Sequence, residues 1–194
     1  MSEIRNILFS GVGGQGILLA SELTAAALLQ AGYDVKKSEV HGMAQRGGSV
    51  TAQLRYGERV YSPLIDPGAA DIQMAFEMME AVRYLPYLNT DSTVIVNTQK
   101  ILPPSVATGQ AAYPENVLDE LIKRDIKVIA VDAFTIAKEA GEVRTANVAL
   151  VGALSVHLDV EAELFESIIA QRVPQRFLEE NMKAFAGGRA AGGE

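Results

Sequence analysis

The stretch GVGGQG, residues Gly11 to Gly16, constrains the fold of this chain more than any other feature. It follows a short apolar run from Asn6 to Ser10 and precedes a segment from Ile17 to Ala31 whose leucines and alanines recur with helical spacing. Gly32 comes directly after that segment, where a helix commonly ends. The order strand, glycine turn, helix is typical of α/β proteins in which the turn lies at the carboxyl end of a strand.

The rest of the chain also alternates apolar runs with helical segments. A strand predicted from Val35 to Val40 would complete a βαβ-like opening. The alternating segment 49–56 runs into Gly57 and Glu58 and resumes at 59–64, which predicts an antiparallel hairpin. Further buried strands are predicted at 71–76, 93–97 and 127–132, and further helices before Tyr84, from Asn116, and across 146–158 and 161–185 with a break at Pro174.

These elements predict a three-layer α/β/α fold with a Rossmann-like mixed sheet that contains an antiparallel hairpin. We expect a single domain over residues 1–186, because a chain of 194 residues is long enough for one well-buried core. The last residues, 187–194, read GGRAAGGE and predict a flexible tail.

The composition argues against several classes of function. The net charge of −7 and the lack of a lysine and arginine cluster argue against a nucleic-acid partner. No run approaches the roughly 18 apolar residues of a membrane helix, and the N-terminus lacks the apolar core of a signal peptide, so we expect a cytoplasmic protein with no membrane partner. The chain has no cysteine to ligate an iron–sulfur cluster, and its two histidines are far apart in sequence, which argues against a histidine-rich zinc site. No metal site is predicted, although magnesium held by carboxylates stays an alternative.

The glycine turn allows three interpretations. In this context its backbone N–H groups and the helix N-terminus could bind a phosphate of a nicotinamide or flavin dinucleotide. Such a site also needs an acidic residue at the end of the second strand, and the candidate there, Glu39, comes late. The turn could instead be purely structural, or it could contact another anion or a partner protein.

A second glycine-bearing stretch, HGMAQRGGS from His41 to Ser49, places a histidine, a glutamine and an arginine beyond the end of a strand. Ligands bind at that position in open α/β sheets, so the stretch is a candidate binding loop. The alternative is a polar loop whose glycines supply positive φ angles. Asn147, near the start of a later helix, is a candidate either for a ligand contact or for a helix cap.

Four segments together resemble the gamma subunit or domain of the 2-oxoacid:ferredoxin oxidoreductases. They are GVGGQG, SEVHGMAQRGGSV, DPGAADIQMAFEMMEAVRYLPYL and TANVALVGALS. The resemblance covers residues 4–185, and its most specific part, from His41 to Val50, is similar to the small beta subunit in the indolepyruvate branch of that family. Relatives that act on pyruvate or 2-oxoglutarate carry a shorter loop of the type Glu-Val-Arg-Gly-Gly.

The resemblance implies oxidative decarboxylation of an indolepyruvate-like aryl 2-oxoacid to an acyl-CoA, with ferredoxin as electron acceptor. It assigns thiamine diphosphate, magnesium and the iron–sulfur clusters to a larger alpha subunit, since this chain has no cysteine and no Gly-Asp-Gly segment of a thiamine diphosphate site. This chain would be inactive alone and would complete the complex. The residues expected to contact coenzyme A or the partner are Gly11, Gly13, Gly14, Gln15, Gly16, His41, Met43, Gln45, Arg46, Gly47, Gly48 and Asn147.

Two alternatives to this interpretation stay open on the sequence. One is a stand-alone dinucleotide-binding oxidoreductase, and the other is a purely structural subunit that contacts no ligand.

Overall fold

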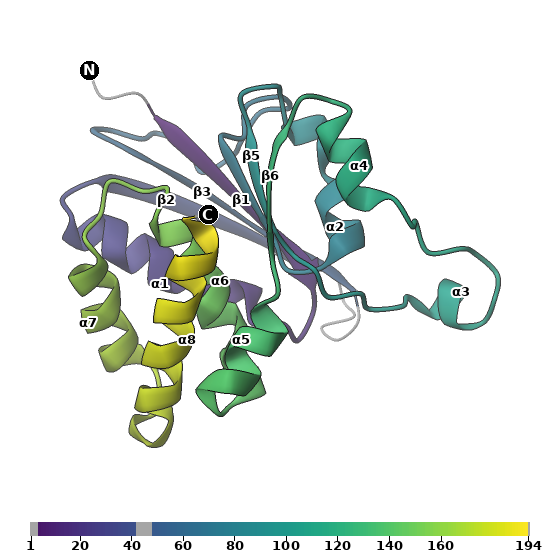
Figure 1. Ribbon diagram of the computed structural model, residues 1–194. Helices are drawn as coiled ribbons and strands as arrows, with labels where there is room; N and C mark the ends of the chain where they lie inside the picture. Colours follow the sequence, from purple (N-terminus) through teal and green to yellow (C-terminus); the bar gives the residue numbers. More distant parts are fainter. Residues whose placement is uncertain (1–3, 42–47, 194) are drawn as a thin grey trace.

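The structure, a computed structural model, describes residues 4–41 and 48–193 and has the predicted three-layer α/β/α arrangement (Figure 1). Its strands are β1 Arg5–Val12, β2 Asp34–His41, β3 Ser49–Gly57, β4 Ile72–Ala75, β5 Thr93–Asn97 and β6 Lys127–Val131. Within the described residues they form one six-stranded sheet in the order β2-β3-β1-β4-β5-β6. Strands β1, β4, β5 and β6 run parallel, whereas β3 is antiparallel to both β1 and β2.

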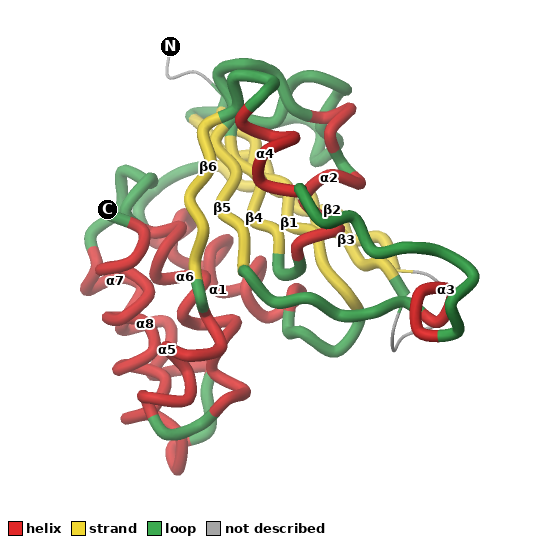
Figure 2. The backbone as a smooth tube through the Cα atoms, turned by 45° about the vertical axis from the view of Figure 1, so that its right-hand side comes forward, coloured by secondary structure: helices red, strands yellow, loops and turns green. Residues whose placement is uncertain are grey.

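Helices cover both faces of this sheet (Figure 1). One face carries α1 Ile17–Gln30, α5 Ala133–Ala140, α6 Ala146–Ser155, α7 Ala162–Arg172 and α8 Leu178–Gly192, and the other carries α2 Met78–Arg83 and α4 Val117–Ile122. Figure 2 shows α3 Pro104–Ala107 on a long excursion that projects from the body. Three 3-10 turns complete the described chain: η1 Leu85–Tyr87, η2 Val143–Thr145 and η3 Gln175–Phe177. No helix in the described ranges has the length and apolar character needed to cross a membrane.

The first strand shows why the apolar run near the N-terminus folds as it does. Ile7 and Phe9 of β1 pack into the core cluster formed with α1, α6, α7 and α8, whereas Leu8 packs into the cluster formed with α2 and α4. Successive side chains of a strand point to opposite faces, so a strand covered by helices on both sides is apolar throughout. This pattern confirms the interpretation of the run as a buried strand between two helical layers.

The antiparallel hairpin in the sheet is formed by β2 and β3, so the predicted placement of the hairpin at 49–56 and 59–64 is wrong. Strand β3 lies between β2 and β1, so both of its edges are already paired. The segment 59–64 is a loop, which Arg55 of β3 holds by donating from Nη1 to the carbonyl oxygens of Ser62 at 3.2 Å and Leu64 at 3.1 Å. Because β3 also separates β1 from β2, the opening is not a βαβ unit with neighbouring strands.

The C-terminal segment also differs from its prediction as a flexible tail. Residues 187–192 are the last turns of α8, and they pack closely on α6. A Cβ atom at Gly188 would lie 1.8 Å from the carbonyl oxygen of Ala149, and one at Gly192 would lie 2.5 Å from that of Ala153. The glycines that resemble low-complexity sequence therefore allow two helix backbones to approach each other.

Candidate functional site

A pocket of about 330 Å³ lies where the chain leaves the carboxyl ends of the parallel strands. Five regions form it: the glycine turn after β1, the residue after β4, the chain at the end of β5, the start of α5, and the chain from η2 into α6. In open α/β sheets this edge binds ligands because the loops after parallel strands gather there. The lining residues are Gly14, Gln15, Gly16, Phe76, Asn97, Gln99, Ile101, Phe134, Val143, Arg144, Ala146, Asn147 and Leu150.

Gln15 fixes the shape of the glycine turn. Its Oε1 accepts a hydrogen bond from the backbone N–H of Val12 at 2.8 Å. Its Nε2 donates to the carbonyl oxygen of Phe76 at 2.8 Å and to Oε1 of Gln99 at 3.1 Å. The turn is thereby tied to the segments that follow β4 and β5. Since both polar atoms of the amide are engaged inside the chain, Gln15 positions the turn.

Asn97, the last residue of β5, extends this amide network to α5. Its Nδ2 donates to the carbonyl oxygen of Phe76 at 3.1 Å, and its Oδ1 accepts from the backbone N–H of Ala133 at 3.2 Å. The side chain is buried, so these bonds satisfy groups that would be costly to leave unpaired. Asn97 therefore gives the pocket a fixed polar wall.

Gly16 brings the start of α1 against the start of α6. It is the N-cap residue of α1 and has a left-handed φ of 79°. The backbone conformation favours glycine, and a Cβ atom at this position would lie 2.4 Å from Nδ2 of Asn147, so a side chain here would displace that amide. Gly14 has a φ of 107° but open space around it, so its backbone is accessible from the pocket.

Asn147 is the polar side chain that meets the glycine turn. It is the second residue of α6, two positions after the N-cap residue Thr145, and it is 7% exposed. Its Oδ1 accepts from the backbone N–H of Val148 at 2.9 Å, but the N-cap residue of α6 is Thr145, so the prediction of Asn147 as a helix cap is wrong. Within the described residues no acceptor lies within hydrogen-bond distance of its Nδ2, and the ligand contact stays a prediction.

The electrostatics of the pocket favour an anion. Helices α1 and α6 both begin there, and neither has a side-chain cap or an acidic residue in its first turn. The N–H groups and partial positive charge of two helix N-termini therefore face the same space.

Arg144 lines the pocket as well, and its bond to Glu142 at 2.9 Å raises the pKa of Arg144 and lowers the pKa of Glu142 to about 2. Both groups are charged at neutral pH.

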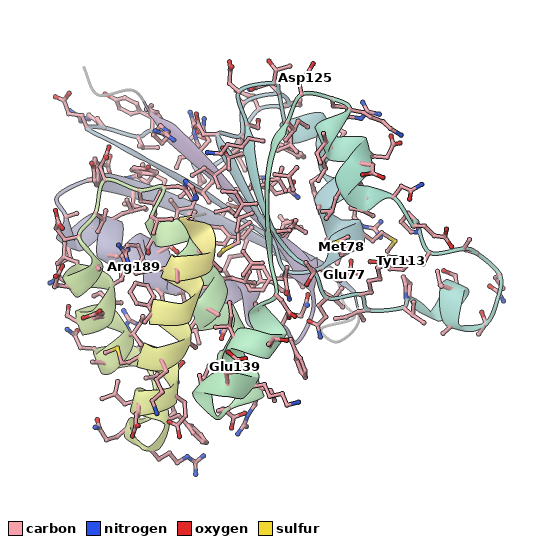
Figure 3. All side chains as sticks on the ribbon, viewed as in Figure 1. Glu77, Met78, Tyr113, Asp125, Glu139 and Arg189 are labelled. Carbon is pink, nitrogen blue, oxygen red and sulfur yellow. The ribbon has the colours of Figure 1, made fainter. Side chains whose placement is uncertain are left out.

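Glu77 anchors the far wall of the pocket. Its buried carboxylate caps α2 by accepting from the backbone N–H groups of Met79 and Glu80. It also accepts from the backbone N–H of Ile101 at 3.0 Å and from the hydroxyl of Tyr113. Figure 3 shows Glu77 and Tyr113 side by side, and burial together with this hydrogen bond raises the pKa of Tyr113. The carboxylate thus holds Ile101 at the pocket.

The structure brings together some of the residues predicted as contacts. Those that line the pocket are Gly14, Gln15, Gly16 and Asn147. Gly11 is part of β1, where a Cβ atom would lie 2.8 Å from Cβ of Phe76, so this glycine serves packing. The N–H of Gly13 donates to the carbonyl oxygen of Gly48 at 2.8 Å, which joins the two glycine-bearing stretches.

The structure describes only the ends of the second glycine-bearing stretch. His41 is the last residue of β2, where its backbone pairs with Val50 of β3. On the return of the chain, Ser49 Oγ donates to Oε2 of the buried Glu80 at 2.5 Å. The remaining predicted contacts lie outside the described residues, and their roles stay predictions: Met43, Gln45, Arg46 and Gly47.

Sequence reasoning missed several residues of the pocket. One feature of the sequence could have indicated Asn97 as a site residue: it is an asparagine at the end of a buried strand. No feature of the sequence indicates Arg144, because it reaches the pocket only through the packing of η2 and α6 beside the glycine turn. The apolar rim of Phe134 and Val143, each almost half exposed, was missed for the same reason.

The donor set of this chain does not fit an iron–sulfur cluster. Its irons need cysteine thiolates, and the full sequence has none. In the described part of the chain, no three histidine, aspartate or glutamate side chains gather closely enough to hold a metal ion.

Residues 6–191 match the family model described as pyruvate ferredoxin/flavodoxin oxidoreductase. The chain is 45% identical over 188 residues to indolepyruvate oxidoreductase subunit IorB of Pyrococcus horikoshii, and 44% identical over 187 residues to that of Thermococcus kodakarensis. Each match covers 93% of this chain and 92% of the relative. A third relative, the pyruvate/ketoisovalerate oxidoreductases common subunit gamma of Pyrococcus abyssi, is 31% identical over 95% of this chain and 93% of its own length.

Solved structures agree with this relationship. The gamma subunit of a keto/oxoacid ferredoxin oxidoreductase from Geobacter sulfurreducens superposes with a TM-score of 0.71 at 25% identity, over 97% of this chain and 98% of that chain. The 2-oxoglutarate:ferredoxin oxidoreductase of Magnetococcus marinus has the same fold, with a TM-score of 0.78 at 19% identity over all of this chain and 32% of that chain. The chain therefore belongs to the pyruvate ferredoxin/flavodoxin oxidoreductase family and is one of its gamma-type subunits.

Proposed function

We propose that this chain is the small subunit of an indolepyruvate ferredoxin oxidoreductase, which oxidatively decarboxylates an aryl 2-oxoacid to an acyl-CoA. One contrast carries the proposal. The chain is 44% and 45% identical to two indolepyruvate oxidoreductase subunits but 31% identical to a pyruvate/ketoisovalerate gamma subunit, with similar coverage in each case.

The residues of this chain support a division of labour with a larger subunit. Decarboxylation of a 2-oxoacid needs an electron sink that amino-acid side chains do not provide. Thiamine diphosphate supplies that sink when bound, and iron–sulfur clusters carry the electrons to ferredoxin. We assign both to the larger subunit, because this chain has no thiolate to hold a cluster and no Gly-Asp-Gly segment of a thiamine diphosphate site. In this proposal the small subunit is inactive alone.

Coenzyme A is the ligand that we assign to the pocket at the glycine turn. The accessible backbone of Gly14, the Nδ2 donors of Asn147 and two helix N-termini suit the phosphates of such a ligand. The apolar rim of Phe134 and Val143 suits its uncharged arm. The Magnetococcus marinus enzyme was solved with 2-oxoglutarate, coenzyme A and succinyl-CoA bound, which supports the class of ligand.

The two alternatives, a stand-alone dinucleotide enzyme and a purely structural subunit, differ in how well they agree with the structure. A stand-alone dinucleotide enzyme loses its candidate ribose ligand, because Glu39 lies on the edge strand β2, pairs with Lys37 at 2.6 Å and does not line the pocket. One observation favours a purely structural subunit. The amide of Gln15 is hydrogen-bonded within the chain, and the space beside Gly16 is filled by Asn147. The experiment must therefore separate catalysis by the complex from mere assembly.

The test combines the purified chain with the larger subunit and measures coenzyme A-dependent reduction of an artificial electron acceptor. We expect neither subunit to be active alone, because the cofactors and the completed site are on different chains. The mixture should prefer indolepyruvate over pyruvate by roughly tenfold or more in kcat/KM, since an aromatic side chain adds far more than one methylene of buried surface.

Three outcomes would count against the proposal. Full activity of the larger subunit without this chain would leave the small subunit without a role in the reaction. A preference for pyruvate would contradict the indolepyruvate assignment. Micromolar NAD(H) binding by the chain alone would favour the dinucleotide alternative.

A further inference from the structure

A second hollow, of about 270 Å³, gathers arginines from three separate segments of the chain. Arg144 comes from η2, Arg172 from the last position of α7, and Arg176 from η3. We call this site the arginine hollow, defined by these three residues and Phe177. Arg144 and Asn147 line both this hollow and the pocket at the glycine turn, so the two spaces adjoin.

The arginine hollow is positive although the chain has a net charge of −7. Glu142 lines it, and its carboxylate is already engaged with Arg144, which donates from Nε at 3.1 Å and from Nη2 at 2.9 Å. No carboxylate in residues 4–41 and 48–193 lies within ion-pair distance of Arg172 or Arg176. Two guanidinium charges are therefore left without a compensating acid.

Phe177 holds two of the guanidinium groups in place. The guanidinium carbon of Arg176 lies 4.7 Å from the ring centroid, and that of Arg144 lies 5.3 Å from it. Stacking on a ring leaves the N–H groups at the edge of a guanidinium able to donate to another acceptor. Arginines held in this way lose less rotational freedom when an anion binds.

A helix end explains only part of this arrangement. Arg172 is in the last turn of α7, where a cation complements the partial negative charge of the helix C-terminus. That effect accounts neither for Arg176, which lies on a separate 3-10 turn, nor for the convergence of three segments on one hollow.

We propose that the arginine hollow binds the phosphate group of a small anionic ligand. Two uncompensated guanidinium charges match a phosphate dianion, whereas a single carboxylate would leave one of them unpaired. The planar fork of arginine also matches two phosphate oxygens at once. The volume admits a phosphate or diphosphate, and the adjoining pocket gives the rest of the ligand room to extend. The proposal does not rest on the coenzyme A assignment, because its probe is inorganic.

The experiment titrates the full chain with inorganic pyrophosphate and follows binding by calorimetry. The wild-type chain should bind at millimolar concentrations or below, and added salt should weaken the binding. The double variant Arg172→Ala/Arg176→Ala should bind roughly tenfold more weakly or worse, because it loses charge-assisted hydrogen bonds. The variant Arg172→Lys/Arg176→Lys should recover only part of the affinity, since lysine keeps the charge but not the fork.

Arg124→Ala is the matched control, because it removes an exposed arginine just after α4, on the opposite face of the sheet. It should bind pyrophosphate as the wild type does. Equal affinity in the wild type and in the double alanine variant would overturn the proposal, and so would the absence of wild-type binding at millimolar pyrophosphate. Loss of assembly with the larger subunit in the double variant, without wild-type pyrophosphate binding, would identify the arginines as a contact for an acidic partner segment. Unchanged thermal unfolding of the variants would show that the exposed substitutions leave the fold intact.

Discussion

Replacing Gly188 with alanine should lower the free energy of unfolding by at least about 3 kcal/mol. A Cβ atom there would lie 1.8 Å from the carbonyl oxygen of Ala149 and 2.6 Å from its carbonyl carbon. Because the obstacle is the backbone of the buried helix α6, no side-chain rotation can relieve the clash. Thermal unfolding should show a Tm lower by about 6 °C or more, at roughly 2–4 °C per kcal/mol for a chain of this size.

Gly193→Ala is the matched control, because it adds the same methyl group at the end of the same helix. The nearest atom to its Cβ would be the carbonyl oxygen of Arg189 at 3.5 Å, an ordinary contact. Its free energy of unfolding should stay within about 0.5 kcal/mol of the wild-type value. If Gly188→Ala unfolds like this control, the close packing of α8 on α6 is contradicted.

Gly16→Ala should cost about 2–4 kcal/mol of stability and should weaken assembly with the larger subunit. Part of the cost, about 1–2 kcal/mol, comes from placing a side chain at a φ of 79°. The rest comes from the approach of the new methyl group to Nδ2 of Asn147 at 2.4 Å. Chemical unfolding measures the first effect, and co-elution with the larger subunit measures the second.

A double-mutant cycle with Asn147→Ala separates the two parts of that cost. The alanine removes Nδ2 and Cγ and leaves Cβ at 3.2 Å, so the contact with the new methyl group is largely relieved. In the Asn147→Ala background, the stability lost through Gly16→Ala should then be smaller than in the wild type by about 1 kcal/mol or more. If the stability costs of the two substitutions are strictly additive, the start of α1 is not in close contact with the start of α6.

The first strand, the glycine turn and the first helix could be predicted because local signals decide them. Three consecutive apolar residues, Ile7 to Phe9, stand shortly before Gly11, which is what a strand buried on both faces requires. The glycines that follow occupy positions with positive φ at Gly14 and Gly16, and Gly32 closes α1 with a φ of 95°. Each of these features depends on residues close together in the sequence.

Strand pairing could not be predicted in the same way. The segment 59–64 alternates like a strand, but the order of the sheet leaves β3 no free edge to pair with it. That order is set by contacts between residues distant in sequence. The end of α8 was misjudged for a related reason, since glycines that pack on Ala149 and Ala153 have the same composition as a flexible tail.

The sequence predicted part of the candidate site, but not Asn97 at the end of β5 or the residues that reach the pocket only through packing. The turn from Gly14 to Gly16 and Asn147, which was predicted as a contact, do line one pocket. Gln15 was expected to contact a ligand or partner, but its amide is engaged with the chain itself. Arg144 reaches the pocket from a 3-10 turn far along the chain, which no local pattern reveals.

In the complex that we propose, the glycine turn and the start of α6 face the larger subunit and the ligand that it processes. Hydrogen–deuterium exchange on the chain, alone and mixed with the larger subunit, tests this claim most directly. We predict new protection in peptides covering Gly11 to Gly16 and residues 145–150, and unchanged exchange in α4 on the opposite face of the sheet. Protection confined to α4 or to the edge strand β6, with the glycine turn exchanging as in the free chain, would contradict it.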